Sequence, residues 1–148
     1  MSSSVPVAYI DIRVLAHATE DREKALASVR NLLPLEFCDE IVFRRSDLKG
    51  HHGNPITLLE ARVKGNEHTR EVLTKLVAGL SIMDKEQLGR EIDLFMEDGN
   101  LYLRFDKQSA YLGELKLCSG DSVHFKLHFS KSSKDDVVEF CRRFGVIL

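Results

Sequence analysis

The sequence predicts an α+β fold, in which one mostly antiparallel sheet carries helices on one face, within a single domain over residues 1–148. Three observations lead to this prediction. The chain has 148 residues, the usual length of one domain. Several segments alternate apolar and polar residues, as strands with one solvated face do. Finally, hairpin signals outnumber signals for the crossover connections that a parallel sheet needs.

The N-terminal part is predicted to form a strand, a helix and a second strand. Residues 7–18 alternate with a period of two, which predicts a long strand. Thr19 followed by acidic residues is typical of a helix N-terminus, and Pro34 ends that helix. Residues 41–46 are expected to form the next strand. In the first strand the apolar face comprises Ala8, Ile10, Ile12, Val14 and Ala16, and the solvated face comprises Tyr9, Asp11, Arg13 and His17.

The middle of the chain is predicted to contain a loop, a strand and two helices. Residues 49–55 include two glycines and an Asn-Pro pair, which indicates a turn or loop. Residues 56–64 alternate again and form the next strand. Asn66 is expected to cap a helix that continues to about Leu80, and the pattern Asp84-x-x-Gln87 resembles the capping box of a third, short helix.

The C-terminal part is predicted to be mostly hairpins. Residues 92–96 and 101–105 flank an Asp-Gly pair, a strong signal for a two-residue turn. A short strand is expected at 115–117. The last helix begins at Ser132 or Ser133 and ends at Gly145. In the strand 122–129 we expect Val123, Phe125, Leu127 and Phe129 to be buried, and His124, Lys126 and His128 to face solvent.

Composition excludes several classes of protein. The 21 basic and 23 acidic residues give a net charge of −2. Domains that bind nucleic acid through overall charge usually have an isoelectric point above about 9, and the value here is about 6.3. Three cysteines without close spacing indicate no disulfide framework and favour the cytoplasm. We find no secretory signal and no apolar stretch long enough to cross a membrane.

Motifs of enzymes and metal proteins are missing. The sequence contains no phosphate-binding loop, no dinucleotide-binding glycine motif and no His-Glu-x-x-His. His124 and His128 lie on a predicted strand, about 13 Å apart, so they do not share a metal ion. We therefore expect no catalysis, metal or cofactor. The alternative left open is a small hydrolase built on His17, Asp21 and Asp106.

The charges are unevenly distributed along the chain. Residues 41–75 contain seven cations and four acids, a net charge of +3, whereas residues 84–98 contain two cations and six acids, a net charge of −4. Such segregation suits an anionic partner on one side, although an ordinary mixed surface is the alternative. In the stretch 101–111, Tyr102 and Arg104 face outward, and bases can lie on such a surface.

Four motifs resemble those of a known family over essentially the whole chain. They are Ala16-His-Ala-Thr-Glu-Asp21, Arg30-Asn-Leu-Leu-Pro34, Gly50-His-His-Gly-Asn-Pro-Ile56 and Leu101-Tyr-Leu-Arg-Phe-Asp-Lys-Gln108. In this order they resemble an archaeal family described as RNA-binding proteins or predicted exosome subunits. The resemblance implies RNA as the partner. It also implies a fold like that of the ribosomal protein that binds the small RNA of the central protuberance, and it transfers no catalytic residues.

Together these observations predict a non-catalytic RNA-binding protein, with exosome or ribosome-related proteins as further partners. The alternative is a protein-interaction module, such as a homodimer within an RNA-processing assembly. Basic residues are expected to contact phosphates, and polar residues of the loop and the strand end to add hydrogen bonds. The predicted RNA-binding residues are Lys49, His51, His52, Asn54, Arg62, Lys64, Tyr102, Arg104, Lys107 and Gln108.

Overall fold

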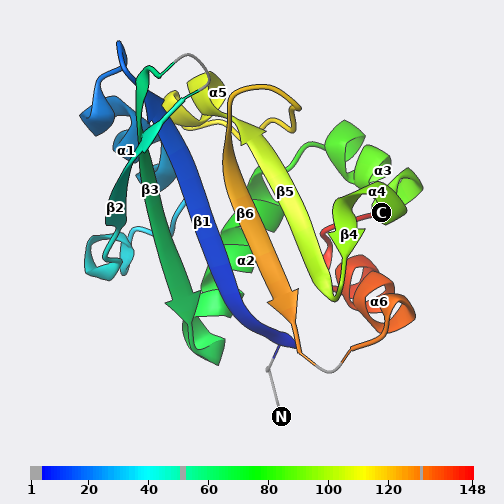
Figure 1. Cartoon of the computed structure of the whole chain (residues 1–148). Coiled ribbons are helices and arrows are strands. Elements are labelled where there is room, and N and C mark those ends of the chain that lie inside the picture. The colour runs from blue at the N-terminus through cyan, green and yellow to red at the C-terminus, as the bar shows by residue number, and fades with distance from the viewer. Residues whose placement is uncertain (1–4, 51–52, 131) are drawn as a thin grey trace.

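The long first strand, β1 (Val7–His17), lies inside a six-stranded sheet in the computed structural model, which describes residues 5–50, 53–130 and 132–148. Antiparallel partners β3 (Pro55–Lys64) and β6 (Ser122–Phe129) flank it. All neighbouring strands are antiparallel, in the order β2-β3-β1-β6-β5-β4 (Figure 1). The outer strands are β2 (Arg44–Lys49), β5 (Asn100–Asp106) and β4 (Met96–Glu97).

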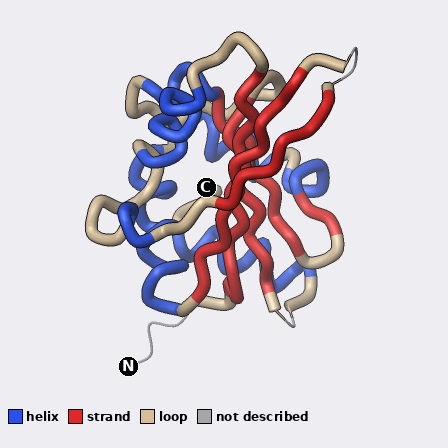
Figure 2. Tube along the Cα trace, turned by 60° about the vertical axis from the view of Figure 1, so that its left-hand side comes forward, coloured by secondary structure: helices blue, strands red, loops and turns tan. Residues whose placement is uncertain are grey.

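Most of the helical turns gather on one side of the strands, as the sequence predicts (Figure 2). The longest helix, α2 (Asn66–Gly79), packs against β1 and β3. Helix α1 (Arg22–Arg30) contacts both β1 and α5 (Lys107–Tyr111). The other helices are the 3₁₀ turn η1 (Cys38–Glu40), α3 (Ile82–Arg90), α4 (Ile92–Phe95) and α6 (Lys134–Phe144).

The core lies between the sheet and these helices. Alternate residues of each strand point into it, because successive side chains of a strand face opposite ways. Burial of each large apolar side chain contributes about 1.5–3 kcal/mol. The predicted pattern of β6 is confirmed, since Val123, Phe125 and Leu127 are buried while His124 and Lys126 are half-buried. Further buried residues are Ile10, Ile12 and Val14 of β1, Leu101, Leu103 and Phe105 of β5, and Val72, Leu73 and Leu76 of α2.

The predicted Asp-Gly hairpin is present, but its first arm is shorter than expected. Asp98 and Gly99 both have positive φ, as a two-residue hairpin turn requires, and Glu97 pairs with Asn100. Residues 92–95 are helical, so the prediction of a strand over 92–96 is wrong for all but its last residue. The reason is their spacing: Ile92 and Phe95 pack against the core one helical turn apart, while Leu94 points to solvent.

Several predicted boundaries shift because other residues make the capping contacts. Asp21, not Thr19, caps α1, since its carboxylate accepts a hydrogen bond from the Glu23 amide. Helix α3 is capped by Ser81 rather than by Asp84.

A register shift near the start of β1 leaves Ala8 exposed instead of buried.

Three further predictions can be compared with the structure. Strand β2 starts at Arg44, three residues later than expected. The predicted strand at 115–117 is reduced to one bridge, between Leu117 and Phe105. The last helix has the predicted ends: Ser133 forms a capping box, and Gly145 takes the left-handed conformation after the last turn.

Candidate nucleic-acid interface

The face of the sheet that points away from α2 is open, and it faces the viewer in Figure 1. Its side chains form rows, because residues paired across antiparallel strands share a face and lie about 5 Å apart. The pairing defines a Tyr9 row (Lys64, Tyr9, His128, Asn100), an Asp11 row (Arg62, Asp11, Lys126, Tyr102) and an Arg13 row (Glu60, Arg13, His124, Arg104). We call these twelve residues the open face.

The open face is basic although the whole chain is acidic. Its charged residues are five cations and two acids, a net charge of +3 with the histidines neutral, against −2 for the chain. Arginines of β3 and β2 already neutralise the two acids. Arg62 forms a bidentate pair with Asp11, with N–O distances of 2.7 and 2.9 Å, and Arg44 lies 3.4 Å from Glu60.

The remaining four cations of the open face lie on β1, β3, β5 and β6. Within the described part of the chain, Arg13, Lys64, Arg104 and Lys126 form no ion pair with a carboxylate. Lys126 lies 5.8 Å from the centre of the Tyr9 ring, a weak cation–π contact. These four side chains therefore keep their charge available for an external anion.

The two tyrosines of the open face differ in accessibility. Tyr9 stacks on His128 at 4.6 Å and carries the Arg62 guanidinium 3.8 Å from its centre, so neighbours from both flanking strands cover it. Tyr102 is 38% exposed. It lies between two hollows, one of about 280 Å³ toward Arg13 and one of about 680 Å³ toward α4. Tyr102 is therefore the ring on which an unstacked base could lie.

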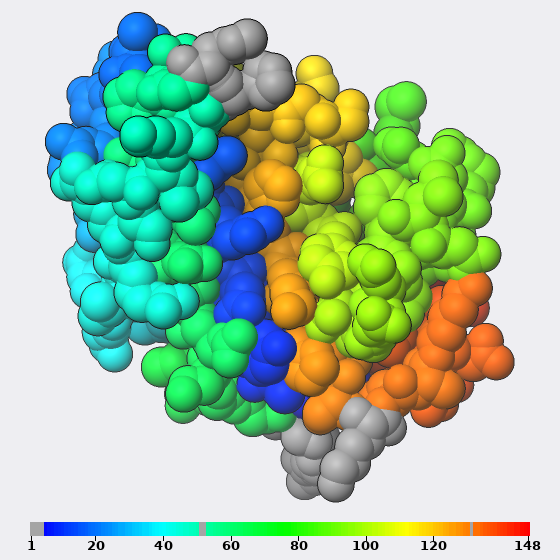
Figure 3. Space-filling model, viewed as in Figure 1, coloured from blue at the N-terminus to red at the C-terminus, as the bar shows by residue number. Residues whose placement is uncertain are grey.

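The open face is concave in the space-filling view. Strands β1 and β6 form a recessed floor between a ridge that contains β2 and a ridge that contains α4 and β4 (Figure 3). The second ridge belongs to the acidic segment 84–98, and its Glu97 lines the larger hollow. Positive charge thus lies on the floor, and negative charge lies along one rim.

His124 occupies the centre of the Arg13 row. Partial burial lowers the pKa of its imidazole, and the positive charges of Arg104 and Arg13 lower it further, while Asp121 opposes them. Its Nε2 atom lies 3.3 Å from the Ser122 hydroxyl. Because the positive charges of Arg104 and Arg13 help to lower this pKa, an anion that approaches the row would raise it.

Four of the ten predicted RNA-binding residues come together on the open face: Arg62, Lys64, Tyr102 and Arg104. Lys49 and Asn54 are exposed at the β2–β3 hairpin, and the register places Lys49 on the opposite face from Arg44 and Glu60. His51 and His52 lie outside the described residues. The basic segment 41–75 therefore does not form one surface, since Lys75 also lies on α2 and bonds to the Leu33 carbonyl.

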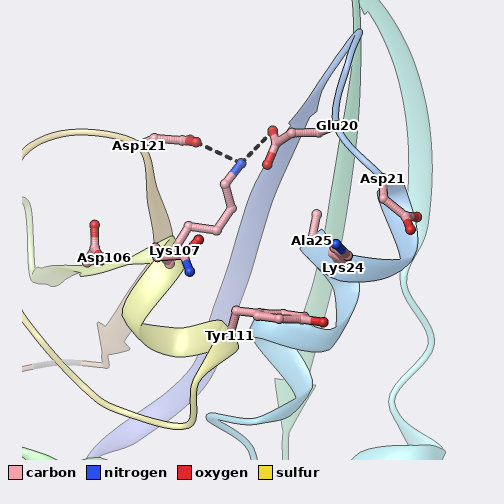
Figure 4. A pocket seen from close by; sticks show the side chains of 9 residues that line it. Glu20, Asp21, Lys24, Ala25, Asp106, Lys107, Tyr111 and Asp121 are labelled. Atoms are coloured by element: carbon pink, nitrogen blue, oxygen red, sulfur yellow. Dashed lines mark hydrogen bonds and ion pairs between the residues drawn. The ribbon is translucent and has the colours of Figure 1, made fainter.

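Lys107 is not where the sequence interpretation requires it. Its side chain is only 9% exposed, and its ammonium donates to the Leu15 carbonyl at 2.7 Å and to Glu20 and Asp121 at 2.8 Å each (Figure 4). The reason is that the chain turns into α5 directly after β5, which points this lysine inward. Gln108 is exposed and lines a hollow of about 310 Å³ that contains Lys107 and Tyr111.

The sequence interpretation did not count Arg13, His124 and Lys126 of the open face among the RNA-binding residues. The alternation places each on a solvated strand face, so that signal was present. Alternation does not show which strands pair. Strand β6 pairs with β1, more than 100 residues earlier in the chain, and with β5, about 20 residues earlier. Only this pairing brings Arg13 and Arg104 to either side of His124.

The residues of the alternative hydrolase are engaged in other contacts, although Asp21 and Asp106 line the same hollow. Asp21 caps α1, and Asp106 accepts hydrogen bonds from the amide and hydroxyl of Ser109, which lower its pKa. His17 instead faces Asp121, with 3.6 Å between its Nε2 atom and the carboxylate.

His17, Glu20 and Asp121 have ligand atoms within 4.8 Å of one another, the spacing of a metal site. The Lys107 ammonium already bonds to two of the three.

No described helix is both long and apolar enough to span a bilayer.

Comparison with known proteins extends these observations. Residues 9–129 match a family model described as RNA binding. The chain is 34% identical over 149 residues to the RNA-binding protein PAB1135 of Pyrococcus abyssi, and the match covers 97% of each chain.

Solved structures show the same fold. The protein AF2318 of Archaeoglobus fulgidus, of the family DUF54, superposes with a TM-score of 0.80 at 29% identity, over 93% of this chain and 99% of the other. The DUF54 protein Mth689 of Methanothermobacter thermautotrophicus gives a TM-score of 0.77 at 30% identity, over 94% and 98%. With an open basic sheet face and a family match across most of its length, this chain belongs to the RNA-binding family that these archaeal proteins represent.

Proposed function

We propose that this protein binds single-stranded RNA on the open face of its sheet and carries out no chemistry on it. The observation that supports this proposal most directly is the set of four cations, Arg13, Lys64, Arg104 and Lys126, that form no ion pair with any described carboxylate. A basic, concave sheet face inside an acidic protein is suited to a polyanion, since the local field rather than the net charge attracts it.

The proposed contacts divide into two kinds. The four cations neutralise phosphates, which supplies affinity without sequence preference. Tyr102 supplies a platform for one base, because the hollows on both sides leave its ring accessible. Single-stranded RNA suits this arrangement better than duplex RNA. In a duplex the bases are stacked on one another, and protein side chains cannot read the deep major groove.

Salt dependence of RNA affinity tests the proposal. With four phosphates contacted, log affinity for a short single-stranded RNA should fall with log salt at a slope of roughly −3, at about −0.7 per phosphate. Changing Arg104 to Ala should make the slope less steep by about one phosphate's share. An affinity that does not change with salt, or that is unaffected when all four cations are replaced, would overturn the proposal.

The second candidate, a protein-interaction module, is favoured by exposed apolar residues at the α3–α4 edge. Ile82, Met83 and Leu94 are 66%, 79% and 79% exposed. In that case affinity for the partner should depend only weakly on salt. Membership of an exosome or ribosome-related assembly, a ribosomal-protein-like fold and a homodimer stay predictions, and co-purification with and without ribonuclease tests the assembly.

A further inference from the structure

In the Arg13 row, two arginines flank one histidine. In the register, His124 is directly opposite Arg13 on one side and Arg104 on the other. Neighbours paired in this way have Cβ atoms about 5 Å apart, so the two arginines flank the imidazole. A hollow of about 280 Å³ is lined by Arg13, His124 and Lys126 among others, and Arg104 lines the neighbouring hollow of about 680 Å³.

The acids around this hollow do not balance its charge, because each is bound by another cation. Asp11 is held by Arg62 at 2.7 and 2.9 Å. Glu60 lies 3.4 Å from Arg44, and Asp121 lies 2.8 Å from Lys107. The charged groups that surround His124 are thus Arg104 of β5, Arg13 and Asp11 of β1, Glu60 of β3, Lys126 of its own strand and Asp121 just before it.

We infer that the Arg13 row is a binding subsite for one phosphodiester group, and that His124 takes up a proton when this group binds. This inference rests on the proposed function, since the phosphodiester is a phosphate of the bound RNA. Two guanidinium forks and an imidazolium N–H supply charge-assisted donors for a single anion.

The coupling follows from the charges. Without an anion, burial and then the charges of Arg104 and Arg13 hold the pKa of His124 below its usual value. A phosphate between the arginines cancels their repulsion and favours the protonated imidazole. By linkage, RNA must then bind more tightly as the pH falls through the range in which His124 titrates. For each unit by which RNA binding raises the pKa of His124, the affinity for RNA can increase at most tenfold.

The test measures binding of a uridine decamer at constant salt, from about pH 8 to about pH 5.5, a range in which histidine is the side chain that titrates. We expect the native protein to bind several-fold more tightly at the lower pH. His124→Gln should lose this pH dependence, because glutamine cannot take up the proton. His68→Gln is the matched control: His68 lies on α2 against Phe37, off the open face, and its variant should keep the dependence.

A second measurement avoids any effect of the substitution on folding. NMR titration of the His124 ring in the native protein should give a higher pKa with the decamer bound than without it. Equal values, or a pH dependence that persists in His124→Gln, would overturn the inference. If replacing Arg13, Lys64, Arg104 and Lys126 together weakens binding at about pH 8, the proposed function stands without this inference; if that variant binds RNA as tightly as the native protein at every pH, the proposed function itself fails.

Discussion

The Arg13 row and the surroundings of Lys107 contain the same kinds of side chain and use them in opposite ways. Each has cations, a histidine and carboxylates. At Lys107 two carboxylates and a carbonyl bond to the ammonium of a side chain that is 9% exposed. In the Arg13 row, within the described part of the chain, neither Arg13 nor Arg104 has a carboxylate partner. We call the surroundings of Lys107 the closed site, because its cation is bonded to groups of the protein, whereas the arginines of the Arg13 row are available to an external anion.

The difference arises from where the acids lie. Glu20 and Asp121 belong to the turns that follow β1 and precede β6, so they meet at the end of the sheet, where Lys107 begins α5. On the open face, Asp11 and Glu60 lie beside Arg62 and Arg44 of neighbouring strands, which neutralise them. The availability of a cation is therefore set by strand pairing and not by local charge density along the sequence.

Breaking the closed site should have the largest effect on stability. Lys107→Met keeps the aliphatic stem but leaves a carbonyl and two carboxylates without the ammonium, and we expect a loss of about 3 kcal/mol in the free energy of unfolding. Chemical denaturation measures it. Lys24→Met, an exposed lysine of the same hollow, is the control and should change stability by less than about 0.5 kcal/mol.

The same variant separates the two interpretations of Lys107. Because its ammonium is internally bonded, RNA affinity of the folded Lys107→Met protein should match that of the native protein. If affinity falls while stability is unchanged, Lys107 contacts RNA as the sequence interpretation predicts.

Removing cations of the open face that form no ion pair should have the largest effect on RNA affinity. In the triple variant Arg13→Ala, Arg104→Ala, Lys126→Ala, the salt slope should change from roughly −3 to about −0.7, and affinity at about 0.1 M salt should fall about 100-fold. Stability should change little, because these side chains form no ion pair within the described residues.

A control with the same loss of charge makes this test specific. Arg22, Lys24 and Arg30 of α1 are exposed cations off the open face. Replacing all three with Ala changes the net charge equally. If that variant loses as much affinity as the open-face variant, net charge rather than the Arg13 and Asp11 rows controls binding.

Two tyrosines of almost equal exposure compare the regions directly. Tyr102 of the open face is 38% exposed and Tyr111 beside the Lys107 hollow is 39% exposed. Tyr102→Ala should weaken RNA binding by about 1–3 kcal/mol with little change in salt slope, as expected for a lost base stack. Tyr111→Ala should leave affinity unchanged. Equal effects of the two substitutions on titration by fluorescence anisotropy would contradict a stacking site at Tyr102.

Much of the fold could be predicted because it follows from local patterns. Alternation located β1, β3, β5 and β6, and helical spacing located α2 and α6. Residues 92–95 show where this fails: the Ile92-Asp-Leu-Phe95 stretch is compatible with either period, and packing of Ile92 and Phe95 against the core decides for a helix. Tertiary contacts decide whether a short apolar segment forms a helix or a strand, and an alternating pattern gives no information about those contacts.

The candidate site could be predicted only in part. Tyr102, Arg104, Arg62 and Lys64 were identifiable as outward residues of strands, and they do share a face. Two facts needed the structure. The Asp11 carboxylate neutralises Arg62 from a strand about 50 residues away in the chain, and α5 turns Lys107 inward directly after β5. Both depend on non-local pairing.

The smallest expected effect concerns the pH dependence of stability, and it sharpens the contrast at His124. In the folded protein the pKa of His124 lies below its ordinary value, which the unfolded chain restores. Folding therefore favours the neutral ring: its full stability is present above the unfolded pKa of about 6.5 and is lost as the pH falls through that value toward the folded pKa. Solvent screening keeps the effect below about 1 kcal/mol.

Thermal unfolding of the native protein and of His124→Gln, at about pH 7.5 and about pH 5.5, isolates this contribution from that of the carboxylates. The native protein should lose slightly more stability on acidification than the variant. Saturating uridine decamer should reverse the order, because a phosphate in the Arg13 row stabilises the protonated ring that the free protein disfavours. An order that is the same with and without RNA would mean that no anion occupies the row, and that its arginines bind RNA, if at all, away from His124.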